Sequence, residues 1–247
     1  MESQGSPAEP RGLAHGFGMS RRPGERWTRF AARIGDAFGL VLLLVVSLYV
    51  LGSLVPFSGW GGFAQAATTG TCAVVALISA RAGRRLVRWA LAFGIAGAAL
   101  AAAEALGGGS TLSGASALIE VALLAVAAAV VLGTVLTESE VGFRTILGAI
   151  SVYVILGLLF TYVYWAVERL QGGSFFGQPI QTGDFLFFSI TTLTTTGYGN
   201  LVPAAQPGRM LSGLEMLIGQ IFLVTLIAGL VSLWRPGLGA VRRRAKE

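Results

Sequence analysis

The sequence predicts an all-α membrane protein with six transmembrane helices and a shorter, re-entrant helix between the last two. Three observations carry this prediction: the composition, the lengths of the apolar runs, and the distribution of basic residues between those runs. Of the 247 residues, 54% are hydrophobic and 12% are charged, and the mean hydropathy is +0.71. Soluble domains carry about a quarter charged residues, so this composition indicates a membrane protein.

Six apolar runs are long enough to span a membrane. A helix needs about 20 apolar residues to cross a hydrocarbon core roughly 30 Å thick. The predicted spans are 37–57, 63–80, 86–106, 115–136, 144–166 and 209–233, of which 63–80 is the shortest. The apolar stretch 183–195 is too short to cross and has the length expected of a re-entrant helix.

These runs divide the chain into four parts. We expect a disordered basic cytoplasmic tail at 1–33, which is rich in Pro, Gly, Ser and Arg, and a four-helix membrane module at 34–138. A unit of two spans with the re-entrant helix between them follows at 139–235. A short basic cytoplasmic tail is expected at 236–247.

The basic residues predict the orientation. With six spans, all but two of the 18 Lys and Arg residues fall on one side, and the exceptions are Arg169 and Arg209. Basic residues favour the cytoplasmic side, so we expect a multi-pass protein of the cell membrane with both termini in the cytoplasm. Anionic lipids should be drawn to the basic stretch 242–246 at the inner face.

Several function classes are disfavoured by the composition. The single cysteine, Cys72, lies in an apolar run and the single histidine, His15, lies in the tail, so no disulfide framework or zinc cluster is expected. No paired carboxylates, nucleophile–base pair or phosphate-binding loop stands out, which argues against an enzyme and against a cofactor. The basic residues do not form the aromatic-interleaved surface of a nucleic-acid partner.

The segment after the re-entrant helix carries the most specific motif. Residues 184–203 read DFLFFSITTLTTTGYGNLVP. Irregular backbone at membrane depth is tolerated where it lines a water-filled path or is buried in protein. Dehydrating K⁺ requires a ladder of backbone carbonyls, and Gly197 and Gly199 supply the freedom at positive φ that such a ladder needs. We expect the Thr195 hydroxyl to add the innermost oxygens and the Tyr198 ring to pack outward.

The motif Thr195, Thr196, Gly197, Tyr198 and Gly199 is similar to the TVGYG selectivity filter of the potassium-channel pore domain. The resemblance covers 143–234 and includes Phe187, Phe188, Ser189, Pro203, Gly208, Arg209 and Gly219. The lead-in resembles prokaryotic six-span potassium channels that lack a cytoplasmic ligand domain. The resemblance implies a potassium-selective channel that conducts K⁺ passively. Because one filter strand encloses nothing and four are needed, it also implies a homotetrameric pore.

Three residues depart from the family pattern. Thr196 stands where Val is usual, and Asn200 stands where Asp is usual, which removes a negative charge at the outer mouth. Thr191 occupies the position where some members carry a Glu that pairs with that Asp. Two alternatives therefore stay open: a weakly selective cation channel of the same fold, and a non-conducting membrane sensor or regulatory subunit.

The first four spans are not expected to sense voltage, because 115–136 contains no arginine. Their expected part is a packing collar, in which small residues permit close helix contact; these residues are Gly94, Gly97, Ala98 and Ala101. We expect Glu104 and Glu120, near the outer ends of their spans, to face the membrane interface.

Thr191, Glu215 and Gly219 are candidates for supporting the filter or for gating. A carboxylate inside a span indicates function by default, and Glu215 lies about one turn outward of Gly219. It either hydrogen-bonds the pore helix behind the filter or only holds helices together. Gly219 is either a bending point of the last helix or a glycine required for helix packing.

Overall fold

The computed structural model describes residues 38–137, 143–172 and 174–233, and within these ranges the chain forms seven helices and no strand. The helices are α2 (Phe38–Leu54), α3 (Gly59–Ser79), α4 (Arg84–Ala105), α5 (Ser110–Thr137), α6 (Phe143–Gln171), α7 (Gly183–Leu193) and α8 (Gly208–Leu233). The expected tails at 1–33 and 236–247, with His15 and the basic stretch 242–246, lie outside the described residues.

Five of these helices are long and apolar enough to cross a membrane, namely α3, α4, α5, α6 and α8. The apolar helix α2 has 17 described residues and α7 has 11, so both fall below that length. The helical class expected from the sequence is therefore confirmed.

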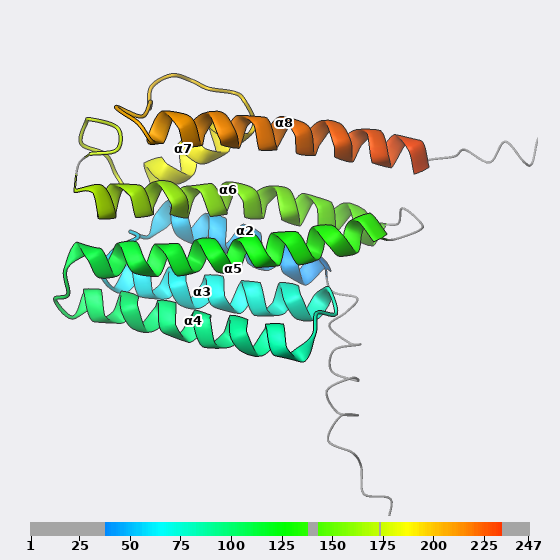
Figure 1. The fold of residues 1–247 in the computed structure, drawn as a ribbon, viewed down its shortest axis with the longest axis horizontal. Helices are drawn as coiled ribbons and strands as arrows, with labels where there is room; N and C mark the ends of the chain where they lie inside the picture. Colours follow the sequence, from blue (N-terminus) through cyan, green and yellow to red (C-terminus); the bar gives the residue numbers. More distant parts are fainter. Residues whose placement is uncertain (1–37, 138–142, 173, 234–247) are drawn as a thin grey trace, which may run out of the picture.

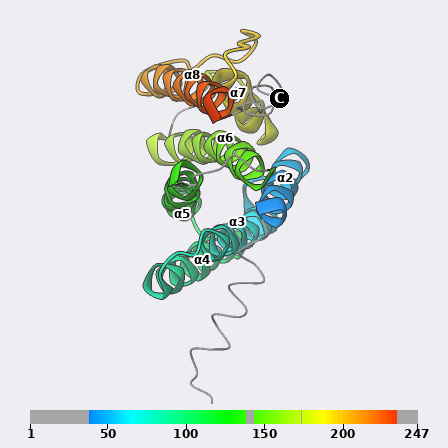
Figure 2. The same cartoon turned by 90° about the vertical axis from the view of Figure 1, so that its right-hand side faces the viewer.

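The helices form a bundle in which α6 is central (Figure 1). Viewed along the helices, α6 lies between the α7–α8 pair on one side and the helices α2 to α5 on the other (Figure 2). It contacts α2, α5, α7 and α8. Its buried residues include Val152, Ile155, Leu158 and Tyr164. A helix that is apolar all round can be covered on several sides, which suits a central position.

The ends of the helices alternate along the bundle (Figure 1). The connection between α3 and α4, which carries Arg81, lies at the same end as the C-terminal end of α8, and the connection between α4 and α5 lies at the opposite end. From that opposite end α7 runs part of the way along the bundle, and residues 194–207 return to it before α8 begins. The chain between α6 and α8 therefore enters and leaves by one end.

Small residues bring α3 and α4 close together, as the sequence suggested. A Cβ added to Gly70 of α3 would lie 3.1 Å from the Cα of Gly94 in α4. Gly94, Gly97 and Ala101 are buried in the bundle, and Ala98 is half-buried.

The expectation that Glu120 faces the interface is wrong. Its side chain is 1% exposed and lies inside the helix bundle. Glu104 is largely covered too: it pairs with Arg169 at 3.4 Å and accepts the Gly59 amide at 2.6 Å. In a span made mostly of Ala, Leu and Val, no polar face shows which way a single carboxylate points.

Candidate ion-conduction site

Aromatic packing fixes α7 against α6 and the chain before it. The Tyr164 ring of α6 lies 5.1 Å from both Phe175 and Phe188, measured between ring centroids. Phe185 of α7 packs on Phe176 at 5.3 Å. These rings are buried, and aromatic contacts of this kind add about 0.5–1.5 kcal/mol each beyond the area they bury. The cluster therefore holds α7 at a defined height in the bundle.

Glu215 joins three helices by hydrogen bonds. The Tyr164 hydroxyl donates to Glu215 Oε2 at 2.5 Å, and the Ser189 hydroxyl lies 2.6 Å from Oε1. The same Ser189 hydroxyl lies 2.7 Å from the Gly157 carbonyl oxygen of α6. The Glu215 side chain has no exposed surface. The sequence left two roles open for Glu215: a hydrogen bond to the pore helix or a contact that only holds helices together. The structure has the hydrogen bond to α7, and the same carboxylate also holds α6 and α8 together.

Gly219 lies where α8 crosses the C-terminal end of α7. A Cβ at this position would lie 2.2 Å from the Leu193 carbonyl oxygen, closer than any side chain can come. That oxygen also accepts the Tyr153 hydroxyl at 3.2 Å. Since α8 continues as one helix through Gly219, the geometry favours the packing role over the bending role.

The backbone of residues 195–199, the candidate filter segment, alternates in conformation. Thr195, Gly197 and Gly199 have φ values of 55°, 51° and 79°, whereas Thr196 and Tyr198 between them do not have positive φ. The sequence pointed to the two glycines but not to Thr195. A non-glycine residue at positive φ costs on the order of 1 kcal/mol or more, so other contacts must hold Thr195 in place.

Two sets of hydrogen bonds fix the inner part of this segment. The Thr196 and Gly197 amides both donate to the Thr191 carbonyl oxygen, at 2.8 and 3.1 Å. Gln220 of α8 donates from Nε2 to the Thr195 hydroxyl at 2.8 Å. Thr191 thus supports the segment through its backbone carbonyl, while its hydroxyl donates to the Phe188 carbonyl at 3.0 Å.

The outer part of the segment is more open. The Tyr198 ring stacks on Phe187 of α7, with 5.8 Å between centroids and 11° between planes, and is 71% exposed. Asn200 is exposed, and its carbonyl accepts a hydrogen bond from Gln178 Nε2 at 3.4 Å. The Tyr198 side chain therefore packs on the helix that precedes it, and residues 194–200 are exposed in the single chain.

Residues 148–235 match the family model described as an ion channel. The matched part contains α7, the 195–199 segment, α8 and most of α6. The match supports a membrane protein that passes ions passively rather than an enzyme. No curated protein and no solved structure matches the chain.

Sequence reasoning missed three supporting residues in this ion-channel region: Tyr153, Tyr164 and Gln220. Gln220 had a readable signal, because an amide inside an apolar span usually has a specific partner. Tyr164 had none, because aromatic residues near the ends of spans are also expected as interface anchors.

We predict that Gly219→Ala weakens the contact between α7 and α8. The new methyl group would press on the Leu193 carbonyl oxygen, and overpacking of this kind costs about 1–3 kcal/mol. The thermal unfolding midpoint of the purified protein and its ion flux in liposomes should both decrease. Gly213→Ala in the same helix is the control, because a Cβ there meets no atom within 4 Å. Equal effects of the two variants would contradict the packing role.

We predict that Tyr164 and Glu215 are energetically coupled. Removing either partner leaves a buried polar group without its hydrogen bond, which costs about 1–3 kcal/mol. The unfolding free energies of Tyr164→Phe, Glu215→Leu and the double variant should therefore deviate from additivity by about 1 kcal/mol or more. Tyr162→Phe, whose hydroxyl bonds Thr69 and Gln65 instead, should combine additively with Glu215→Leu. If the effects of Tyr164→Phe and Glu215→Leu on the unfolding free energy were additive, the Tyr164–Glu215 hydrogen bond would contribute little to stability.

Proposed function

We propose that this chain is one subunit of a potassium-selective channel of the prokaryotic six-span type, which lets K⁺ pass down its gradient through a tetrameric filter. The observation that carries the proposal is the alternating backbone of residues 195–199, within the region that matches ion channels. Selective K⁺ conduction depends on carbonyl oxygens that replace the hydration shell of the ion. Alternation between negative and positive φ supports such a ladder, because it turns successive carbonyls toward the same side.

Gln220 and Thr195 support a water-lined path at the inner end of the filter. Gln220 is exposed on the single chain, although it belongs to a membrane-spanning helix. Polar groups in such helices usually face a cavity or another protein surface rather than lipid. The hydrogen bond that Gln220 donates to the Thr195 hydroxyl uses one lone pair of that oxygen and leaves the second available to a permeating ion.

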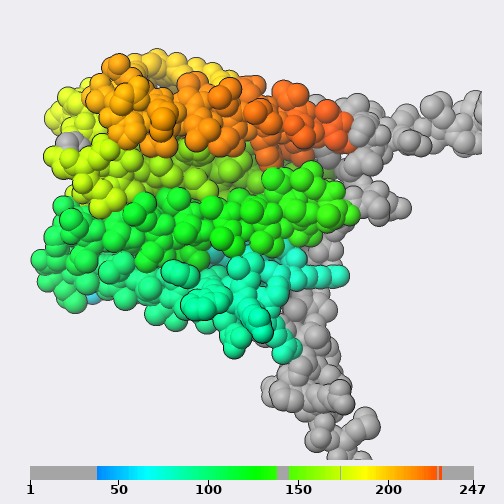
Figure 3. Space-filling view, viewed as in Figure 1, coloured from blue at the N-terminus to red at the C-terminus, as the bar shows by residue number. Residues whose placement is uncertain are grey.

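A homotetramer is supported by the face that α8 leaves uncovered. Only 17% of its apolar window is buried within the chain, against 56% for α6. A row of exposed apolar residues follows the helix at spacings of four and three: Met210, Leu214, Leu217, Ile221 and Val224. Figure 3 shows α8 at the edge of the molecule. Such a row is typical of a helix that packs on other helices, and four copies are needed to surround one path.

The proposed topology has six spans, with α2 as the first. Its 17 described residues equal the lower limit for a spanning helix. Both termini then lie in the cytoplasm of a cell-membrane protein, in agreement with the basic residues of the α3–α4 connection. The partners are other copies of the chain and membrane lipids, with anionic lipid at the basic inner face. The proposal includes no cofactor, no metal besides the permeating K⁺, and no nucleic acid.

We predict that the purified chain in liposomes passes K⁺ about tenfold or more faster than Na⁺. Gly197→Ala should abolish K⁺ flux, because a Cβ is strained at φ 51°, even though that Cβ meets no atom within 4 Å. Gly213→Ala is again the control. Equal K⁺ and Na⁺ flux would favour the weakly selective cation channel, and absence of flux in a correctly assembled protein would favour the non-conducting sensor or regulatory subunit.

We predict that Asn200→Asp increases inward single-channel current. Asn200 is exposed at the outer end of the filter segment, and in a tetramer four carboxylates would form a ring that concentrates cations. The gain should be largest at low ionic strength, because the screening length is only about 10 Å at 0.1 M salt. Recordings over a range of K⁺ concentrations test this. An unchanged current at the lowest salt would show that a charge at this position does not limit the access of ions.

A further inference from the structure

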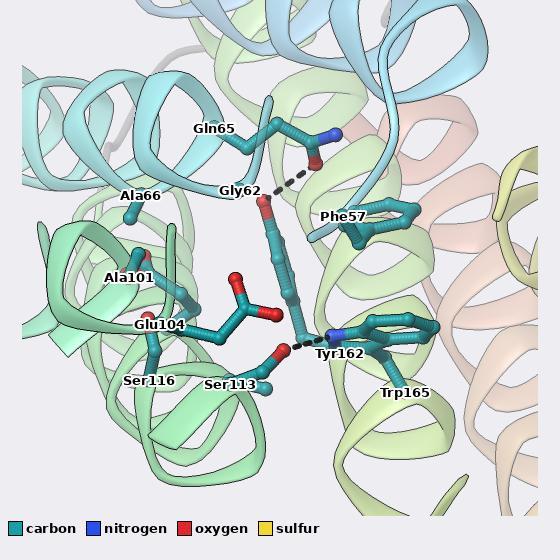
Figure 4. Close-up of a pocket in the computed structure, with 12 residues that line it drawn as sticks. Phe57, Gly62, Gln65, Ala66, Ala101, Glu104, Ser113, Ser116, Tyr162 and Trp165 are labelled. Carbon is teal, nitrogen blue, oxygen red and sulfur yellow. Dashed lines mark hydrogen bonds between the residues drawn. The ribbon is translucent and has the colours of Figure 1, made fainter. Parts of the chain in front are cut away.

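A small polar cavity lies inside the four-helix part of the bundle, away from the filter segment (Figure 4). Residues of α3, α4, α5 and α6 line it, and its polar side chains are Gln65, Glu104, Ser113, Ser116, Glu120 and Tyr162. It has room for about one water molecule. Of these four helices, only α6 belongs to the part of the chain that matches the ion-channel model. The cavity therefore needs an explanation of its own.

Glu120 is the unusual member of this lining. Its side chain is 1% exposed, and neither carboxylate oxygen has a hydrogen-bond partner. The Thr69 hydroxyl lies beside it and also forms a 3.1 Å hydrogen bond with the Tyr162 hydroxyl, in which either oxygen can donate. A Cβ on Gly97 would lie 2.7 Å from Glu120 Oε1, so the glycine leaves the space that the carboxylate occupies. A buried carboxylate without a partner is strongly unfavourable, which indicates that something absent from the protein itself compensates it.

Several hydrogen-bond donors around the cavity already have acceptors. The Ser116 hydroxyl donates to a carbonyl of α4 at 3.0 Å, and Gln65 Nε2 donates to a carbonyl of the α2–α3 connection at 2.7 Å. The Trp165 indole nitrogen donates to the Ser113 hydroxyl at 3.2 Å. Gln65 Oε1 accepts the Tyr162 hydroxyl at 3.4 Å and keeps its second lone pair. The surface that remains is therefore rich in oxygen lone pairs.

The nearest basic side chain does not neutralise Glu120. Arg169 pairs with Glu104 at 3.4 Å and lies over the Trp165 ring, 5.1 Å from its centroid. A neutral Glu120 would still need a partner, because a protonated carboxyl group carries an O–H that needs an acceptor, and neither of its oxygens makes a hydrogen bond within the described residues. A cation in the cavity would satisfy the carboxylate and the free lone pairs together.

We propose that this cavity binds one alkali-metal cation of the size of Na⁺, held by Glu120 with the oxygens of Ser113, Ser116 and Gln65. The small volume favours a dehydrated monovalent ion, since Mg²⁺ usually keeps several waters and Ca²⁺ takes 6–8 oxygen ligands. The site is separate from the filter and goes beyond the proposed channel function. A cation here would link α3 and α5 directly, at a place where both face α6.

The test is a titration of the purified full chain with NaCl. Choline chloride keeps the ionic strength constant, and a constant K⁺ concentration keeps the filter loaded. At a sodium concentration a few times the dissociation constant, the thermal midpoint of the unaltered protein should rise by about 2–4 °C and then saturate. Glu120→Gln should abolish the rise. Glu168→Gln, which removes a carboxylate bonded to the Phe175 amide outside the cavity, should retain it.

A second measurement uses only the unaltered protein, so it does not depend on whether a variant folds. In an infrared difference spectrum of the unaltered protein, exchanging choline for sodium should change a carboxylate band, with K⁺ held constant. The proposal is overturned if the unaltered protein shows no sodium-dependent rise, or if the rise is the same in Glu120→Gln. A protonated carboxyl band that is insensitive to sodium would also overturn it. Potassium flux can succeed or fail independently of each of these results.

Discussion

The last turn of α7 is buried at Thr192 and Leu193, and the last carbonyl groups of a helix have no partner within the helix. The structure meets this constraint with residues of both neighbouring helices. Tyr153 of α6 donates to the Leu193 carbonyl, and Gly219 lets the α8 backbone lie against the same oxygen. The Thr191 carbonyl receives two amides from the segment that follows. The position at which the chain leaves α7 is therefore fixed, and the geometry of 195–199 depends on it.

The same arrangement explains why a buried carboxylate is retained in α8. Glu215 accepts a hydroxyl from α6 and lies within bonding distance of a hydroxyl of α7, so its position depends on both helices being in register. Lipid does not drive apolar helices together as water does, and interhelical packing and hydrogen bonds carry more of the association. A polar group that bonds two partners specifies one arrangement of three helices, which apolar contacts alone leave less well defined.

The sequence predicted most of the helix positions, because the length needed to cross the bilayer and the positions of the polar connections leave few alternatives. The bounds of α3 and α8 differ from the predicted runs by a few residues at most. The motif around Gly197 was readable for a similar reason: the positive φ that a glycine tolerates is a local property. The positive φ at Thr195 was not readable, because a non-glycine residue in this conformation needs support from the rest of the fold, and the Gln220 side chain that bonds its hydroxyl is 25 residues away.

The orientation of single carboxylates could not be predicted from the pattern. Glu104, Glu120 and Glu215 all interrupt apolar runs, yet one reaches an arginine, one lies in a cavity without a partner and one bonds two hydroxyls. Their surroundings come from helices that are distant in sequence. Helical periodicity gives the direction of a residue only relative to its own helix, so the partner is known only once the helices are packed.

The helix α6 connects the two polar regions of this molecule. Tyr162 and Tyr164 are two positions apart and therefore point in directions about 200° apart around the helix. Tyr162 bonds Gln65 beside the cavity between α3, α4, α5 and α6, and Tyr164 bonds Glu215 of α8. Because a helix behaves as a stiff rod over so short a distance, a rotation of α6 that improves one of these bonds must displace the other. The packing of α2 to α5 and the support of residues 195–199 are thus mechanically linked through α6, and α2 also contacts α7 directly.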